Sequence, residues 1–138
     1  HPSGSLATSL IQVKEIMAKK KEIPLVSANQ TLRTALKEMA KKRLGIVCVK
    51  EKSGKINLIT DGDIRRNSNN LYKKKTLQVC SKHPTWISEN ATALSAIEKM
   101  NSLKITSLLV TPTKDIRKKI KKVVGILHLH HCLSRGIK

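Results

Sequence analysis

The chain has 138 residues, of which 39% are hydrophobic and only 1% aromatic, so its core has to be built from Ile, Leu, Val, Ala and Met side chains. That length suits one compact domain or two small intertwined modules. Lys and Arg number 28 against 9 Asp and Glu, a net charge of +19, which raises the question of a polyanionic partner. However, the lysines are scattered, and one Tyr, one Trp and no Phe provide no aromatic platform for stacking single-stranded bases. A compositional bias toward Lys, Asn and Ile explains the charge more simply.

Cysteine usage and hydropathy indicate the compartment. Cys48, Cys80 and Cys132 are widely spaced and odd in number, so they predict no disulfide framework and favour a reducing, cytoplasmic setting. No apolar run approaches membrane-spanning length, and the start of the chain has no signal-peptide pattern. Because His1 is not an initiator residue, we expect the chain to be a piece of a longer protein.

The first half of the chain predicts the order helix, strand, helix, strand, strand, helix. Apolar spacing indicates a short helix ending near Met17 and an amphipathic helix over residues 32–43, with Asn29 as its N-cap. A last helix is expected to start at Asp61. The predicted strands are residues 23–26, 46–49 and 56–60.

The same order returns after a polar connector at residues 67–75. Asn90 matches Asn29 and Met100 matches Met39 at a constant offset, because 90 − 29 = 61 and 100 − 39 = 61. A repeat of this length predicts two similar units that bury their faces against each other, with ligand sites in the cleft between them. The last strand-to-strand loop is longer than its counterpart and very basic, and such a run is more often solvated than bound to nucleic acid.

Candidate binding residues gather where the predicted strand 56–60 meets the following helix. The first N–H groups of a helix lack internal partners, so this junction is a natural seat for phosphate. Thr60 supplies a hydroxyl, Gly62 frees the backbone, and Asp63 can accept from a ribose hydroxyl. The following arginines, Arg65 and Arg66, can add positive charge. An equally good interpretation of this stretch is structural: Thr60 or Asp61 caps the helix, and the arginines are solvated.

The matching junction of the second repeat is rich in histidine. On a helix, His128 and Cys132 share a face with His131 nearby, and together with His130 they raise the question of zinc. Only two or three ligands are available and no second cluster appears, so we predict no metal site. Cys48 and Cys80 are expected to fill space in the core.

These motifs resemble a known family. The repeated unit resembles the CBS domain, and the whole chain resembles a tandem pair, called a Bateman module. It is similar to the C-terminal half of D-arabinose 5-phosphate isomerases of the KpsF/GutQ group, in which a sugar-isomerase (SIS) domain precedes the CBS pair. The stretches that carry this resemblance are residues 1–6, 13–17, 59–66 and 125–133.

The resemblance implies an α/β (α+β) fold made of two intertwined β-α-β-β-α repeats, packed sheet to sheet with pseudo-two-fold symmetry. It divides the chain into four parts. These are residues 1–12 (the tail of the missing SIS domain and a linker), 13–66 (first repeat), 67–75 (connector) and 76–138 (second repeat).

The resemblance also implies a function. The parent enzyme interconverts ribulose 5-phosphate and arabinose 5-phosphate, a step toward Kdo and lipopolysaccharide or capsule. The catalytic domain is missing here, so the chain is not expected to be an enzyme, and His1 resembles a stranded active-site histidine. The chain is expected to pair with itself in a dimer that supports a parent tetramer. Rival interpretations are a basic nucleic-acid-binding module and a purely structural domain without a ligand.

CBS pairs bind adenosine nucleotides through a Ser/Thr-x-x-Asp pattern, which Thr60 and Asp63 match. His128 and His131 depart from that pattern, and a neutral imidazole cannot reproduce the way a carboxylate accepts two ribose hydroxyls. The second half-site therefore either fails or suits a more anionic ligand. The expected ligand is AMP, ATP or, as feedback from the pathway, CMP-Kdo, and no cofactor is required.

Overall fold

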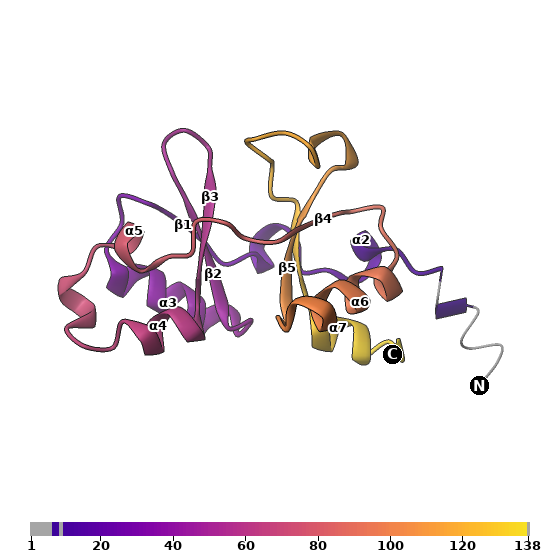
Figure 1. The fold of residues 1–138 in the computed structure, drawn as a ribbon, viewed down its shortest axis with the longest axis horizontal. Helices are drawn as coiled ribbons and strands as arrows, with labels where there is room; N and C mark the ends of the chain where they lie inside the picture. Colours follow the sequence, from indigo (N-terminus) through magenta and orange to yellow (C-terminus); the bar gives the residue numbers. More distant parts are fainter. Residues whose placement is uncertain (1–6, 9, 138) are drawn as a thin grey trace. The chain divides into compact units, whose positions relative to one another are not determined.

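The computed structural model describes residues 7–8 and 10–137, and it confirms the predicted order of elements (Figure 1). His1, the stranded-histidine candidate, lies outside the described residues. The first repeat contains α2 (Val13–Ile16), β1 (Leu25–Ser27), α3 (Leu32–Lys42), β2 (Ile46–Lys50), β3 (Ile56–Thr60) and α4 (Asp61–Arg66). The second contains α5 (Thr76–Val79), β4 (Trp86–Ser88), α6 (Ala93–Leu103), β5 (Ser107–Thr111), β6 (Gly125–His128) and α7 (Leu129–Leu133). Single 3-10 turns are η1 (Lys20–Glu22), η2 (Leu71–Lys73) and η3 (Thr113–Asp115).

Each repeat supplies one three-stranded mixed sheet, which confirms the α/β fold class. In the order β1-β2-β3, β1 runs parallel to β2 and β3 runs antiparallel to it; the order β4-β5-β6 repeats this arrangement. The register pairs Ile46 with Thr60 and Lys50 with Ile56. The end of β3 and the start of α4 therefore lie beside the beginning of β2.

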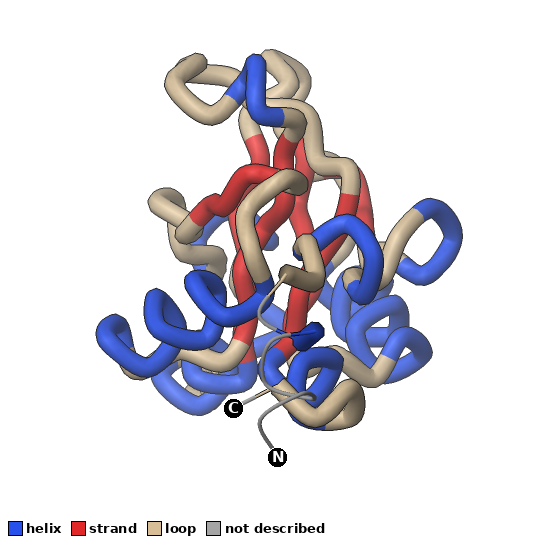
Figure 2. The backbone as a smooth tube through the Cα atoms, turned by 90° about the vertical axis from the view of Figure 1, so that its right-hand side faces the viewer, coloured by secondary structure: helices blue, strands red, loops and turns tan. Residues whose placement is uncertain are grey.

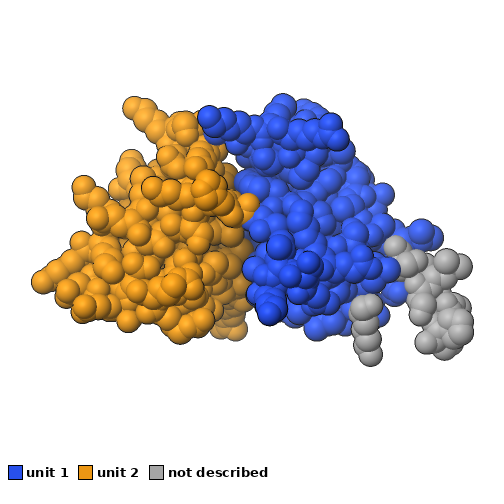
Figure 3. Space-filling view, viewed as in Figure 1, with its two compact units in different colours: residues 1–20, 85–138 blue, residues 21–84 orange. Residues whose placement is uncertain are grey.

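The chain forms two compact units whose limits differ from the repeats as they run along the sequence (Figure 3). The central unit is residues 21–84, and the terminal unit combines the residues before 21 with those after 84. The short first helices are thus exchanged: α2 belongs with β4–β6, and α5 belongs with β1–β3.

Backbone hydrogen bonds explain this exchange. In the terminal unit the Val13 amide donates to the Ala91 carbonyl at 2.8 Å, and Ala18 pairs with Ile126 through two bonds of 2.9 and 3.0 Å. In the central unit Ser81 pairs with Leu58 in the same way, at 2.7 and 3.0 Å. Each linker after a short helix thereby extends the edge of the opposite repeat's sheet.

The N-cap of the first long helix differs from the predicted residue. Thr31, not Asn29, is the N-cap of α3, because its hydroxyl accepts from the Thr34 amide at 3.1 Å. Thr92 caps α6 in the same manner. Asn29 lies instead in the turn between β1 and α3, so the N-cap prediction was wrong.

Aliphatic side chains build a separate core in each unit. In the central unit the buried face of α3 packs against alternate residues of the sheet, among them Val47, Val49 and Ile59. The terminal unit repeats this with α6 against Leu108, Val110 and Leu127. All three cysteines are free and buried, and burial raises the pKa of the Cys48 thiol to about 12.

The β5–β6 loop, residues 112–124, has no counterpart of equal length in the first repeat. Its helical turn η3 stands at the top of Figure 2. Asp115 is buried, pairs with Lys118 at 2.9 Å and accepts from the Lys122 amide at 3.3 Å. The loop is therefore folded around one acidic side chain, while most of its basic side chains face solvent. Among all described residues, no helix is long and apolar enough to cross a bilayer.

Candidate functional site

The junction of β3 and α4 is built on a reciprocal cap. Thr60 ends the strand, and its hydroxyl accepts from the Asp63 amide at 3.2 Å. The Asp63 carboxylate in turn accepts from the Thr60 amide at 2.9 Å and from the Thr60 hydroxyl at 3.0 Å. This capping box satisfies the backbone N–H groups of Thr60 and Asp63 at the start of the helix, and it fixes the direction of the Asp63 side chain.

Asp63 is also the centre of a wider network. It is 5% exposed, and its carboxylate pairs with the Arg66 guanidinium at 2.7 Å. The Ser81 hydroxyl lies 3.1 and 3.3 Å from the two carboxylate oxygens. Sequence reasoning missed Ser81, because its contact depends on the exchanged linker and nothing in the pattern pairs it with α4.

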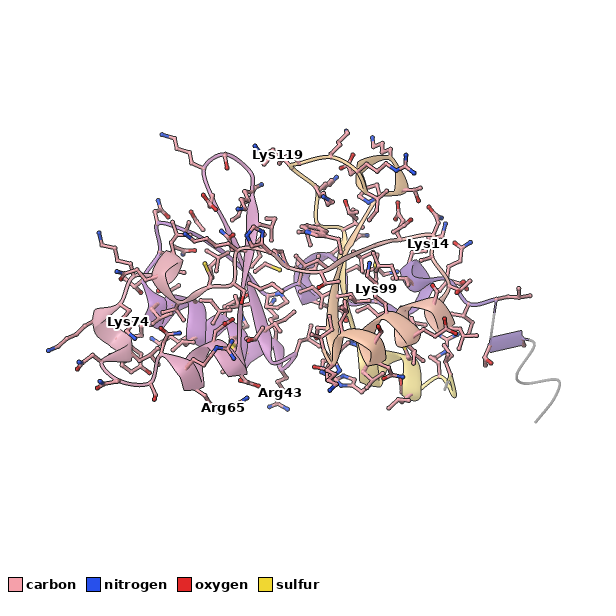
Figure 4. The ribbon with its side chains drawn as sticks, in the orientation of Figure 1. Lys14, Arg43, Arg65, Lys74, Lys99 and Lys119 are labelled. Carbon is pink, nitrogen blue, oxygen red and sulfur yellow. The ribbon has the colours of Figure 1, made fainter. Side chains whose placement is uncertain are left out.

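Gly62 has a different role from the one predicted. It lies inside α4 without a positive φ, so it does not free the backbone. A Cβ at this position would stand 3.0 Å from an Arg66 nitrogen, so the glycine leaves room for the guanidinium. Arg66 is therefore ion-paired rather than merely solvated, although 68% of its side chain is exposed. Arg65 is exposed and points away from the unit, at the same edge as Arg43 (Figure 4).

The second repeat builds the same cap from histidines. His128 ends β6, and its Nδ1 accepts from the His130 amide at 3.1 Å. The Nδ1 of His131 accepts from the His128 amide at 3.0 Å, which is the position taken by the Asp63 carboxylate in the first repeat. Both imidazoles must therefore be neutral, with their proton on Nε2. The rings of His128 and His130 are 4.1 Å apart between centroids.

Electrostatics favour the neutral form of His128. Burial, followed by the neighbouring His130 and His131, lowers the pKa of His128 below its ordinary value. Cys132 lies behind the cluster and is fully buried, which raises the pKa of its thiol. Within residues 7–8 and 10–137, no group of three or more His, Cys, Asp or Glu side chains is arranged to hold a metal ion.

Two open hollows lie elsewhere in the central unit. One has a volume of about 850 Å³ and follows the end of β1, residues 25–30, with Lys50 and Leu77. The other, of about 620 Å³, lies between the start of α3 and residues 72–76. No residue of the α4 junction lines either hollow. Lys50, which lines the first, is at the opposite end of β2 from the residue that pairs with Thr60.

The sequence profile of the CBS domain matches residues 13–70 and 77–137. The chain belongs to the CBS domain family. It contains two CBS domains in tandem, each with the strand-to-helix junction described above.

The chain is also similar in sequence to known isomerases. It is 34% identical over 142 residues to the arabinose 5-phosphate isomerase KdsD of Francisella tularensis, a match that covers 100% of this chain and 42% of that protein. The chain thus spans less than half of this relative, and it is homologous over its whole length to the C-terminal CBS region of such isomerases.

Two solved CBS structures share the fold at low sequence identity. CBSX2 in complex with AMP has a TM-score of 0.75 at 16% identity, covering 91% of this chain and 96% of that one. The CBS domain of a bacterial CNNM/CorC family Mg²⁺ transporter in complex with ATP has a TM-score of 0.74 at 18% identity, covering 97% and 92%.

Proposed function

We propose that this chain is the regulatory and oligomer-supporting CBS pair of an arabinose 5-phosphate isomerase. Its match to KdsD over its whole length supports this assignment. On this proposal catalysis belongs to a sugar-isomerase domain outside the chain. The CBS pair reports a metabolite to that domain and holds copies of the parent together.

The observation that carries the binding proposal is the Asp63 carboxylate, fixed by the Thr60 cap at the start of α4. A fixed carboxylate can accept both hydroxyls of a ribose, and the arginines that follow it in α4 can pair with phosphate. The CBS structures solved with AMP and ATP favour an adenine nucleotide. A nucleotide sugar of the pathway, CMP-Kdo, is the second ligand we propose.

Calorimetric titration of the chain with AMP, ATP and CMP-Kdo tests this proposal. We expect one of the three to bind, and Asp63→Asn to weaken binding about tenfold or more, because the amide loses one acceptor. Asp61→Asn is the matched control, since Asp61 is exposed in the same helical turn and should leave affinity unchanged. Absence of heat and of any melting shift with all three ligands would overturn the proposal.

Oligomer support is tested separately by sedimentation of the ligand-free chain. We expect a dimer at micromolar concentration. A monomer at every concentration would remove the assembly role while leaving the binding role intact.

The basic β5–β6 loop favours one rival function, which is polyanion binding. Its cations are Lys114, Arg117, Lys118, Lys119, Lys121 and Lys122. If the rival holds, the chain binds duplex DNA near physiological salt with a steep salt dependence, and replacing three of these lysines with Gln reduces the slope by about 3. Under the regulatory proposal DNA affinity at that salt concentration is negligible.

A further inference from the structure

The carboxylate proposed to receive a ligand is already saturated by its own chain. A carboxylate offers about four acceptor positions. At Asp63 they are taken by the amide and hydroxyl of Thr60, the guanidinium of Arg66 and the hydroxyl of Ser81. A ligand hydroxyl can reach Asp63 only if one of these four donors leaves.

The four donors differ in how easily they can leave. The Thr60 amide is backbone, and the Thr60 hydroxyl is held by the same cap. The Arg66 side chain is mostly exposed, so its guanidinium can turn from the carboxylate toward a ligand phosphate. The Ser81 hydroxyl, in contrast, belongs to a short neutral side chain and can rotate away about its single Cα–Cβ bond.

Ser81 also has a special place in the chain. It follows α5 within the segment 80–84, which leads from the central unit into the terminal unit. Its counterpart Ala18 makes two equivalent backbone bonds with Ile126 but has no hydroxyl, and the cap residue of α7 that corresponds to Asp63 is His131. The contact therefore exists in one repeat alone.

We propose that Ser81 is an internal competitor for the ribose-binding carboxylate: its hydroxyl occupies the acceptor position of Asp63 that a ligand diol takes. Ligand binding then detaches Ser81 from α4 and loosens the segment that joins the two units. This inference rests on the proposed function, and it specifies the regulation of the same site. It also restricts the ligand to a phosphorylated compound with a free vicinal diol.

The ligand-free chain provides the first test. The Ser81 and Leu58 amides report on the linker, and in Ser81→Ala their hydrogen exchange should accelerate about tenfold, since one bond to a charged acceptor is lost. Ser68→Ala, at an exposed serine beyond α4, is the matched control and should exchange like the original chain. Equal exchange in all three proteins would overturn the contact, whether or not a nucleotide binds.

The second test uses AMP as the probe, with its 2′-deoxy analogue. Ser81→Ala should bind AMP about tenfold more tightly than the original chain, because the competitor is removed, and Ser81→Thr should restore the original affinity. The deoxy analogue should gain less from Ser81→Ala than AMP does. Equal or weaker AMP binding by Ser81→Ala would overturn the competitor role and leave the proposed function standing. If no variant binds AMP, ATP or CMP-Kdo while the exchange result holds, the proposed function and the competitor role both fail, and the contact is purely structural.

Discussion

The starts of α4 and α7 have the same geometry and different chemistry. In α4 the Asp63 carboxylate accepts from the Thr60 amide, and the Thr60 hydroxyl accepts from the Asp63 amide. In α7 the Nδ1 of His131 accepts from the His128 amide, and the Nδ1 of His128 accepts from the His130 amide. Both versions satisfy the helix start, so the fold alone does not require the carboxylate. What the carboxylate adds is an ion pair with Arg66 and a contact with Ser81. The comparison teaches that the two junctions are equivalent as caps and unequal as candidate binding sites.

The largest expected effect comes from removing the charged centre. Asp63→Ala removes the carboxylate that accepts hydrogen bonds from Thr60, Arg66 and Ser81. We therefore expect the free energy of unfolding to fall by about 3 kcal/mol. His131→Ala removes only the neutral acceptor of the second cap and should cost about 1 kcal/mol. Urea denaturation measures both. Similar losses for the two variants would mean that the junctions differ less than their chemistry indicates.

A second difference between the repeats lies in the last strand of each sheet, one residue before the position that pairs with the linker. Gly125 in β6 has no room for a side chain, because a Cβ there would be 2.3 Å from the Met17 sulfur and 2.8 Å from the Ala18 carbonyl oxygen. The matching residue in β3 is Asn57, whose fully buried side chain donates to Glu51 at 2.7 Å. We therefore expect Gly125→Ala to destabilise the chain by about 2 kcal/mol, as measured by its melting temperature. A neutral result would show that the linker can withdraw from β6.

The histidine cap of α7 predicts that the stability of the chain depends on pH near neutrality. Because the folded chain lowers the pKa of His128, the unfolded chain binds more protons as pH falls through the ordinary histidine pKa, so stability decreases in that direction. The groups around His128 on the helix are His130 and His131, and the first turn of α7 has no acidic residue to compensate. Between pH 7.5 and pH 5.5 we therefore expect the free energy of unfolding to decrease.

His128→Thr isolates that effect, since it gives α7 the same cap residue as α4. Its stability measured by urea denaturation should depend less on pH than that of the original chain over the same range. An unchanged pH dependence would place the titration elsewhere in the molecule.

The smallest expected effect concerns Gly62. Alanine is the better helix former by about 1 kcal/mol, but its Cβ would push against the Arg66 guanidinium, which is flexible and mostly exposed. We expect Gly62→Ala to change the unfolding free energy by about 0.5 kcal/mol or less. The same substitution should weaken nucleotide binding measurably if Arg66 has to turn toward the phosphate, and a large loss of stability would contradict the space argument.

Much of the architecture could be predicted from sequence because its signals are local. Short continuous apolar runs and the constant repeat offset predict the strands of both sheets, and Thr60 and Asp63 stand out at a strand end. The N-cap of α3 has a local signal as well, because Thr31 directly precedes Leu32, the first apolar residue of the helix, whereas Asn29 matches only in residue type.

The remainder depends on contacts between distant segments. Ser81 meets Asp63 only because the linker after α5 pairs with β3, and Gly125 is constrained only because the linker after α2 pairs with β6. No local pattern encodes those pairings. The histidine cap was similarly hidden, since histidine is an unusual N-cap residue and its ring nitrogens invited a comparison with zinc ligands.

The exchange of α2 and α5 also sets an order of events during synthesis. The central unit is one continuous stretch, so it can become complete soon after residue 84 leaves the ribosome. The terminal unit has to wait, because the partner of Ala18 is Ile126, at the far end of the chain. During that interval the apolar side chains around Val13 and Met17 have no sheet to cover them. We therefore expect this segment to be open to aggregation and proteolysis between the folding of residues 21–84 and the emergence of β6.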